Sequence, residues 1–137
     1  MQVMTQLAFN GRCREAFELY EKVLGGEIVV MNTFGASDAK LPPGSTASAP
    51  DQIRFAQLQV GDYAILGNDV PEPEYRPLQG FNIALHVQTA DEARQSFKAF
   101  SEGGHIVTPL SDVAWSSAFG MVTDRFGTPW LILALDK

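Results

Sequence analysis

The hydrophobic and polar positions of the chain change their period several times, and these changes predict its elements. Residues 2–9 alternate in the manner of a strand, and the segment NGRCREAFELYEKVLGG then follows the helical period. Asn10 is a candidate N-cap for this helix, and Gly25-Gly26 is typical of a helix C-terminus. One face of the predicted helix carries Cys13, Ala16, Phe17, Tyr20, Val23 and Leu24.

Further strands and a long loop follow this helix. The segment EIVVMNTF has the composition of a strand, whereas GASDAKLPPGSTASAP contains two prolines and small polar residues and is predicted to be a mobile loop. The alternating runs IRFAQLQV and YAILGN are separated by Gly61-Asp62, which predicts a hairpin.

The same order of elements begins again after the proline-rich segment DVPEPEYRPLQ. FNIALHVQ is a predicted strand, and Thr89 and Glu92 have the spacing of a capping box that opens a helix through about Ser101. This helix also ends at Gly-Gly, and HIVTPL follows as a strand. The segment FGMVTDRFGTPWLI then has two apolar runs joined by a polar turn, as expected of a closing hairpin.

The two halves of the chain also share a series of short sequence motifs in the same order. EAFELYEKVLGGEIV and EARQSFKAFSEGGHIV both contain Glu-Ala, an aromatic residue five positions on, Gly-Gly, one polar residue and Ile-Val. We interpret this as an internal duplication, the alternative being two similar helix ends that arose by chance. The predicted organisation is one domain over residues 1–137, with module one at 1–68, a connector at 69–79 and module two at 80–137.

This duplicated unit resembles the vicinal-oxygen-chelate superfamily, which includes glyoxalase I, extradiol dioxygenases and bleomycin-resistance proteins. The blocks FNGRCREAFELYEKVLGGE, VGDYAILGND and GHIVTPLSDVAWSSAFGMVTDRFGTPWLI resemble its PhnB-like branch and cover nearly the whole chain. The resemblance implies an α+β, glyoxalase-like fold in which tandem β-α-β-β-β modules form a cup-shaped mixed sheet with the helices outside. It also implies a homodimer.

The positions at which the superfamily binds metal are altered in this chain. Metal-dependent members place one ligand on each of four strands, and the resemblance puts Met4, Leu66, Asn82 and Leu131 at those places. Divalent metals prefer anionic oxygen, neutral imidazole or thiolate ligands, and these four side chains supply a single amide oxygen. We therefore expect no bound metal and no other cofactor.

Alternation along the strands predicts which side chains face the cup. If Ile83, Leu85 and Val87 turn toward the helix, Asn82 and His86 face the opposite way. The same parity, together with the resemblance, gives the ligand-binding candidates Gln6, Gln57, Gln59, Asn82, His86, Trp115, Phe119, Met121 and Leu131. His86 is the one catalytic candidate, because histidine changes its charge near neutral pH. In the alternative interpretation the glutamines face solvent and His86 has a structural role.

Two further residues, Cys13 and Trp130, are judged by their surroundings. Cys13 lies between Arg12 and Arg14 in the first turn of a helix, which could lower its pKa, but it also fits the apolar stripe, and packing is its predicted role. Trp130 has the helix-facing parity and is predicted to belong to the core.

Composition excludes some partners and leaves others open. The net charge is −6 and the ten basic residues are scattered, which argues against a nucleic-acid or anionic-membrane surface. No apolar run is long enough to span a bilayer, and the beginning of the chain lacks the pattern of a secretory signal. A single cysteine fits a reducing cytoplasm. The predicted location is cytoplasmic.

Three functions are compatible with these features, and they leave open whether the protein is an enzyme. The leading hypothesis is a PhnB-like protein that binds a small organic molecule without a metal. The second is a metal-dependent lyase, isomerase or dioxygenase with a rearranged site that uses His86 and a carboxylate from a loop. The third is a drug-sequestering dimer of the bleomycin-resistance type, which the negative net charge favours for a cationic aromatic drug.

Overall fold

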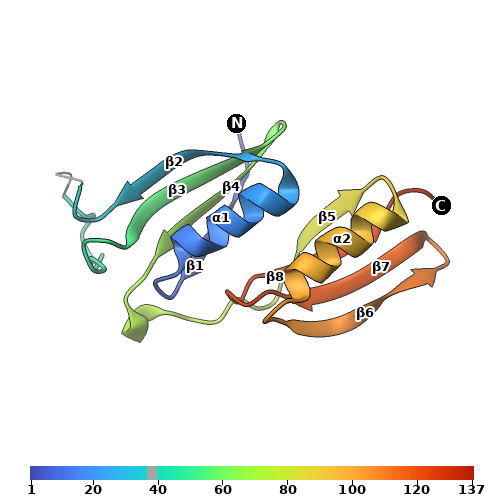
Figure 1. The fold of residues 1–137 in the computed structure, drawn as a ribbon. Coiled ribbons are helices and arrows are strands. Elements are labelled where there is room, and N and C mark those ends of the chain that lie inside the picture. The colour runs from blue at the N-terminus through green and yellow to red at the C-terminus, as the bar shows by residue number, and fades with distance from the viewer. Residues whose placement is uncertain (37–39) are drawn as a thin grey trace. The chain divides into compact units, whose positions relative to one another are not determined.

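Both predicted β-α-β-β-β sequences are present in the computed structural model, which describes residues 1–36 and 40–137 (Figure 1). The chain divides into two units, Met1–Arg76 and Pro77–Lys137. The first unit contains β1 (Thr5–Phe9), α1 (Cys13–Leu24), β2 (Glu27–Thr33), β3 (Ile53–Val60) and β4 (Tyr63–Asp69). The second contains β5 (Ile83–Val87), α2 (Ala90–Ser101), β6 (His105–Val113), β7 (Ser116–Thr123) and β8 (Pro129–Ala134). A single 3-10 turn, Glu72–Glu74, lies between β4 and β5.

The two units have the same sheet topology. The strand orders are β1-β4-β3-β2 in the first sheet and β5-β8-β7-β6 in the second. In each sheet the first strand of the unit runs parallel to its last strand, and the other pairs are antiparallel. The predicted α+β architecture with tandem modules is therefore confirmed.

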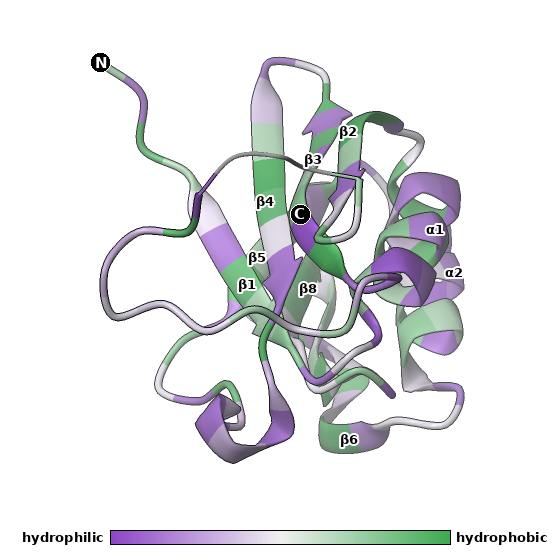
Figure 2. Ribbon diagram, turned by 90° about the vertical axis from the view of Figure 1, so that its left-hand side faces the viewer, coloured by the Kyte–Doolittle hydropathy of each residue, from purple (hydrophilic) through white to green (hydrophobic). Residues whose placement is uncertain are grey.

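Each helix packs on one face of its own sheet (Figure 1). The buried residues are Cys13, Ala16, Phe17 and Tyr20 in α1, and Ala93, Ser96, Phe97 and Phe100 in α2. Both sets have the spacing i, i+3, i+4 and i+7, and hydrophobic and hydrophilic bands follow one another along both helices in Figure 2. Among the described residues, no helix is long and apolar enough to cross a membrane.

The start of α1 differs from the prediction. Asn10 is not its N-cap; Arg12 holds that position and makes no capping hydrogen bond with its side chain. Instead, the backbone N–H of Cys13 donates to Asp69 Oδ1 at 2.9 Å, so a carboxylate at the end of β4 satisfies the first turn of the helix. The predicted helix end is confirmed, because Gly25 has φ 68° and is the C-cap.

The capping box of the second helix is confirmed. The backbone N–H of Glu92 donates to Thr89 Oγ1 at 3.2 Å, and α2 ends at Ser101, as the sequence predicts. The first strand is shorter than predicted, because its pairing with β4 begins at Thr5 opposite Ile65 and residues 2–4 are exposed.

The described ends of the loop after β2 are joined by backbone hydrogen bonds. The N–H of Phe34 donates to the carbonyl of Gln52 at 3.0 Å, and the N–H of Gly35 donates to the carbonyl of Pro50 at 2.9 Å. Residues 37–39 of the predicted mobile loop lie outside the described residues, and its mobility stays a prediction.

Candidate functional site

Each sheet has one face that is covered by a helix and one helix-free face. Along β8, the buried residues Trp130 and Ile132 alternate with the half-buried residues Leu131 and Leu133. Trp130 is 1% exposed and stacks on Phe100 of α2 with ring centroids 4.2 Å apart, which confirms its predicted place in the core. Leu131 and Leu133 therefore lie on the helix-free face.

The helix-free face of the second sheet carries two apolar rows. Cross-strand pairing places Leu131 between Ala84 and Met121, and Leu133 between His86 and Phe119. We refer to Phe119, Met121, Leu131 and Leu133 as the apolar face. All four side chains are half-buried.

The polar candidates of this unit lie along its edge strand. His86 belongs to β5 and is exposed, whereas Asn82 directly precedes β5 and is also exposed. Within the described part of the chain, His86 has no hydrogen-bond or ion-pair partner that would orient its imidazole as a general base.

Trp115 extends the aromatic surface next to Phe119. It lies in the turn between β6 and β7, is 64% exposed, and makes an edge-to-face contact with Phe119 at a centroid distance of 5.6 Å. Trp115 and Phe119 thereby form an aromatic pair, of which the Trp115 ring is mostly exposed.

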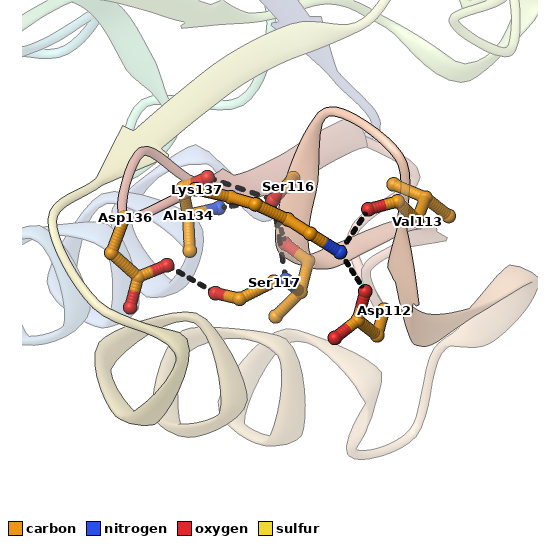
Figure 3. A network of polar contacts seen from close by, with 8 residues as sticks. Asp112, Val113, Ser116, Ser117, Ala134, Asp136 and Lys137 are labelled. Carbon is orange, nitrogen blue, oxygen red and sulfur yellow. Dashed lines mark hydrogen bonds and ion pairs between the residues drawn. The ribbon is translucent and has the colours of Figure 1, made fainter.

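The turn that carries Trp115 is tied to the end of β8 by a buried hydroxyl (Figure 3). Ser116 Oγ donates to the carbonyl of Ala134 at 2.7 Å and accepts from the N–H of the same residue at 3.1 Å. Ser116 is fully buried, so both bonds are sheltered from water.

Polar contacts of the last two residues reinforce this connection (Figure 3). Lys137 Nζ donates to the carboxylate of Asp112 and to the carbonyl of Val113, the latter at 2.7 Å. The hydroxyl of Ser117 donates to Asp136, and this bond lowers the pKa of the Asp136 carboxyl. The backbone on both sides of Trp115 is thereby fixed to the C-terminal end of β8.

The helix-free face of the first sheet is dominated by carboxamides. Leu66 of β4 pairs with Gln6 on one side and with Gln57 on the other. Gln59 and Asn68 follow two residues after Gln57 and Leu66 on the same strands, and thus on the same face. We refer to Gln6, Gln57, Gln59, Leu66 and Asn68 as the amide face.

Hydrogen bonds connect the carboxamides in pairs. Gln6 Nε2 donates to Asn68 Oδ1 at 3.0 Å, and Gln57 Nε2 donates to Gln59 Oε1 at 3.3 Å. Asn68 was not among the predicted site residues, although it lies two residues after Leu66 on β4 and the alternation of this strand places it on the same face.

The positions at which the superfamily binds metal do not fit a metal ion. Leu66 and Leu131 lie on the helix-free faces, and Met4 and Asn82 directly precede the first strand of each unit. Residues 1–36 and 40–137 contain no group of three or more His, Cys, Asp and Glu side chains arranged to hold a metal. A thioether, two alkyl groups and one carboxamide are a poor donor set for a divalent ion.

Cys13 and Asp69 form a buried pair away from both helix-free faces. Burial, and then the charge of Asp69, raise the pKa of the Cys13 thiol, which outweighs the lowering effect of Arg14. Cys13 is 0% exposed and packs in the core as predicted. The role of Asp69 had no local signal, because 56 positions separate it from Cys13.

Comparison with known proteins gives the same fold and related sequences. Residues 3–132 match the model of the glyoxalase/bleomycin resistance protein/dioxygenase superfamily. Protein YjdN of Escherichia coli is 28% identical over 96% of this chain and 94% of its own. The crystal structure of PA1353 from Pseudomonas aeruginosa has a TM-score of 0.87 and 37% identity, and covers 100% of this chain and 99% of its own. The PhnB protein from Bacillus cereus has a TM-score of 0.80 and 20% identity, over 98% of this chain and 99% of its own, which is a likeness of fold.

Proposed function

The chain belongs to the glyoxalase/bleomycin resistance protein/dioxygenase superfamily, and we propose that it binds a small organic molecule on its helix-free sheet faces without a metal ion. The observation that carries this proposal is the donor set at the family's metal positions: Met4, Leu66, Asn82 and Leu131 supply one amide oxygen. Without a metal, the same faces still offer apolar surface and hydrogen-bonding groups, which are the usual components of a small-molecule site.

Stoichiometric metal analysis separates this function from a metal-dependent lyase, isomerase or dioxygenase. We expect less than about one tenth of an equivalent of Zn, Fe, Mn or Ni after mild chelation and gel filtration, since no set of charged donors would hold the ion. One equivalent of any of these metals would contradict the proposal and favour a rearranged site that uses His86.

Asn82, the residue directly before β5, is proposed to form a hydrogen bond with the ligand. Residues 82 and 86 are four apart, so at about 3.3 Å per residue the two side chains are about 13 Å apart and would contact different parts of one ligand. Replacing Asn82 by Leu should weaken binding by about 1–3 kcal/mol if its amide makes a buried hydrogen bond.

Mass spectrometry of a molecule that co-purifies with the protein would identify the ligand for this measurement. Calorimetric titration would then compare wild type, Asn82→Leu and the control Asn10→Leu, because Asn10 is exposed and lies between β1 and α1, outside both sheets. Wild-type affinity in Asn82→Leu would place the site elsewhere, and unfolding of this variant would favour a structural role for Asn82.

Sequestration of a cationic aromatic drug is a second candidate function. Trp115 and Phe119 supply an exposed aromatic pair, and the net charge of −6 would attract a cation. A host that expresses the protein should then survive a raised concentration of a cationic glycopeptide drug, and Trp115→Ala should abolish this protection. Equal sensitivity with and without the protein would rule out this function.

The proposal includes a homodimer, for which membership of the superfamily is the support, and a cytoplasmic location, which the single cysteine fits. Solution scattering should give twice the chain mass of 15.0 kDa over a tenfold range of concentration. A mass that stays at that of one chain would remove the dimer.

A further inference from the structure

The carboxamides of the amide face form two chains that end on backbone carbonyl groups. Gln57 Nε2 donates to Gln59 Oε1, and Gln59 Nε2 donates to the carbonyl of Gly61 at 3.0 Å. On the other side of Leu66, Gln6 Nε2 donates to Asn68 Oδ1, and Asn68 Nδ2 donates to the carbonyl of Asp69 at 3.4 Å.

These terminal carbonyls determine how every amide in the two chains is turned. A backbone carbonyl accepts hydrogen bonds and cannot donate them, so the end of Gln59 that faces Gly61 must be its NH2 group. The oxygen of Gln59 then faces Gln57, which must donate its own NH2. The same argument from Asp69 assigns the oxygen of Asn68 toward Gln6. The orientation of each side-chain amide group is therefore assigned from its hydrogen-bond partners and not from the atom labels alone.

The consequence is that two carbonyl oxygens, Gln6 Oε1 and Gln57 Oε1, end the chains as acceptors. Neither has a hydrogen-bond donor among the residues that the structure describes. Because Gln6 and Gln57 both pair with Leu66, the two oxygens belong to residues on opposite sides of an apolar side chain. The backbones of β1 and β3 are two strand spacings apart, or about 10 Å.

We propose that the amide face binds an uncharged molecule that presents two hydrogen-bond donors on opposite sides of an apolar body, such as a diol with a hydroxymethyl group at each end of a benzene ring. Gln6 Oε1 and Gln57 Oε1 accept from the two donors, and Leu66 packs against the apolar part. This inference rests on the proposed function and names the chemical class of its ligand. Two carbonyl oxygens would repel an anion, and the five side chains of the amide face carry no charge that would pair with a cation.

Two probe molecules with the same benzene ring but different hydrogen-bonding ends test this specificity. The diol 1,4-bis(hydroxymethyl)benzene has two donors, and its dimethyl ether 1,4-bis(methoxymethyl)benzene has none. Titration of ¹⁵N-labelled protein, followed through the side-chain amide signals in NMR spectra, should show the diol shifting the signals of Gln6 and Gln57. The ether should bind at least about tenfold more weakly, because each unpaired acceptor costs affinity.

Variants then connect the preference to the two oxygens. Gln6→Met and Gln57→Met keep the length of the side chain and remove the acceptor, and each should weaken diol binding by roughly three- to tenfold. The matched control is Gln95→Met on the exposed side of α2, which should bind the diol like wild type. Unchanged backbone spectra would show that each variant is folded.

The outcomes separate this inference from the proposed function. Equal binding of diol and ether, or wild-type affinity in both variants, would overturn the inference. If the diol instead shifts the signals of Asn82 and His86, the inference is also overturned, but the helix-free faces still bind a small molecule. No binding of the diol at all would overturn the inference, while the co-purification experiment would still test the proposed function.

Discussion

Asp69 joins three parts of the first unit through its buried carboxylate. Its two oxygens accept from the N–H of Cys13 at 2.9 Å and from the N–H of Ile53 at 2.8 Å, so the end of β4 is tied to the starts of α1 and β3. Asp69→Asn offers one acceptor oxygen and turns an NH2 group toward the other donor. We expect this to lower the free energy of unfolding by about 1–3 kcal/mol in urea denaturation.

The control for this prediction is Asp62→Asn, because Asp62 is exposed in the turn between β3 and β4. Its free energy of unfolding should stay within about 0.5 kcal/mol of wild type. Equal losses in the two variants would show that the hydrogen bonds of Asp69 are not the cause.

The pH dependence of stability gives a second prediction for Asp69. Burial raises its pKa above the ordinary value of 3.8. The folded protein therefore holds this proton more tightly than the unfolded chain, and the resulting stability is complete below about pH 3.8 and lost as the pH rises through the folded pKa. The difference in unfolding free energy between wild type and Asp69→Asn should shrink from about pH 3 to about pH 7. A difference that grows with pH would contradict the raised pKa.

Helix packing in both units depends on a glycine in the sheet beneath an aromatic ring. A Cβ on Gly67 would lie 2.6 Å from Phe17 Cε1, and one on Gly120 would lie 2.8 Å from Phe97 Cε2 and 3.0 Å from the backbone oxygen of Thr108. Gly67→Ala and Gly120→Ala should each cost about 1–3 kcal/mol by overpacking. The loss should be larger at position 120, where backbone atoms cannot move aside. Urea denaturation of both variants tests this order, and a larger loss at position 67 would contradict it.

The elements themselves were predictable where the signal is local. The capping box at Thr89 and the glycine at position 25 act within one helical turn, and both predictions are confirmed. The N-cap at Asn10 was wrong because the groups at the start of α1 are satisfied by Asp69, far away in the sequence. The repeated motifs of the two helices align at an offset of 77 or 78, whereas the buried stripes begin at Cys13 and Ala93, which are 80 positions apart.

At the scale of the whole chain, the repeated order of elements was predictable because it rests on periodicity and turn residues summed over many positions. For the candidate site, the sequence predicts on which face of a strand each side chain lies, but it does not predict how the side chains are oriented. Strand parity identifies Gln57 and Gln59 as neighbours, but the direction of their amides depends on the carbonyl of Gly61 and on the register with Leu66. No local sequence pattern predicts this hydrogen bond or this strand register.

Cooperativity of unfolding tests the proposal that residues 1–137 form one domain. Both tryptophans, Trp115 and Trp130, belong to the second unit, so tryptophan fluorescence reports on Pro77–Lys137, whereas far-ultraviolet circular dichroism reports on both units. A domain of about 60 residues buries only about 60% of its unfolded surface and is marginally stable alone. We therefore expect Gly67→Ala, a change in the first unit, to lower the urea midpoints of both signals equally. If the circular dichroism midpoint falls while the fluorescence midpoint stays at the wild-type value, the two units unfold separately and the single-domain proposal fails.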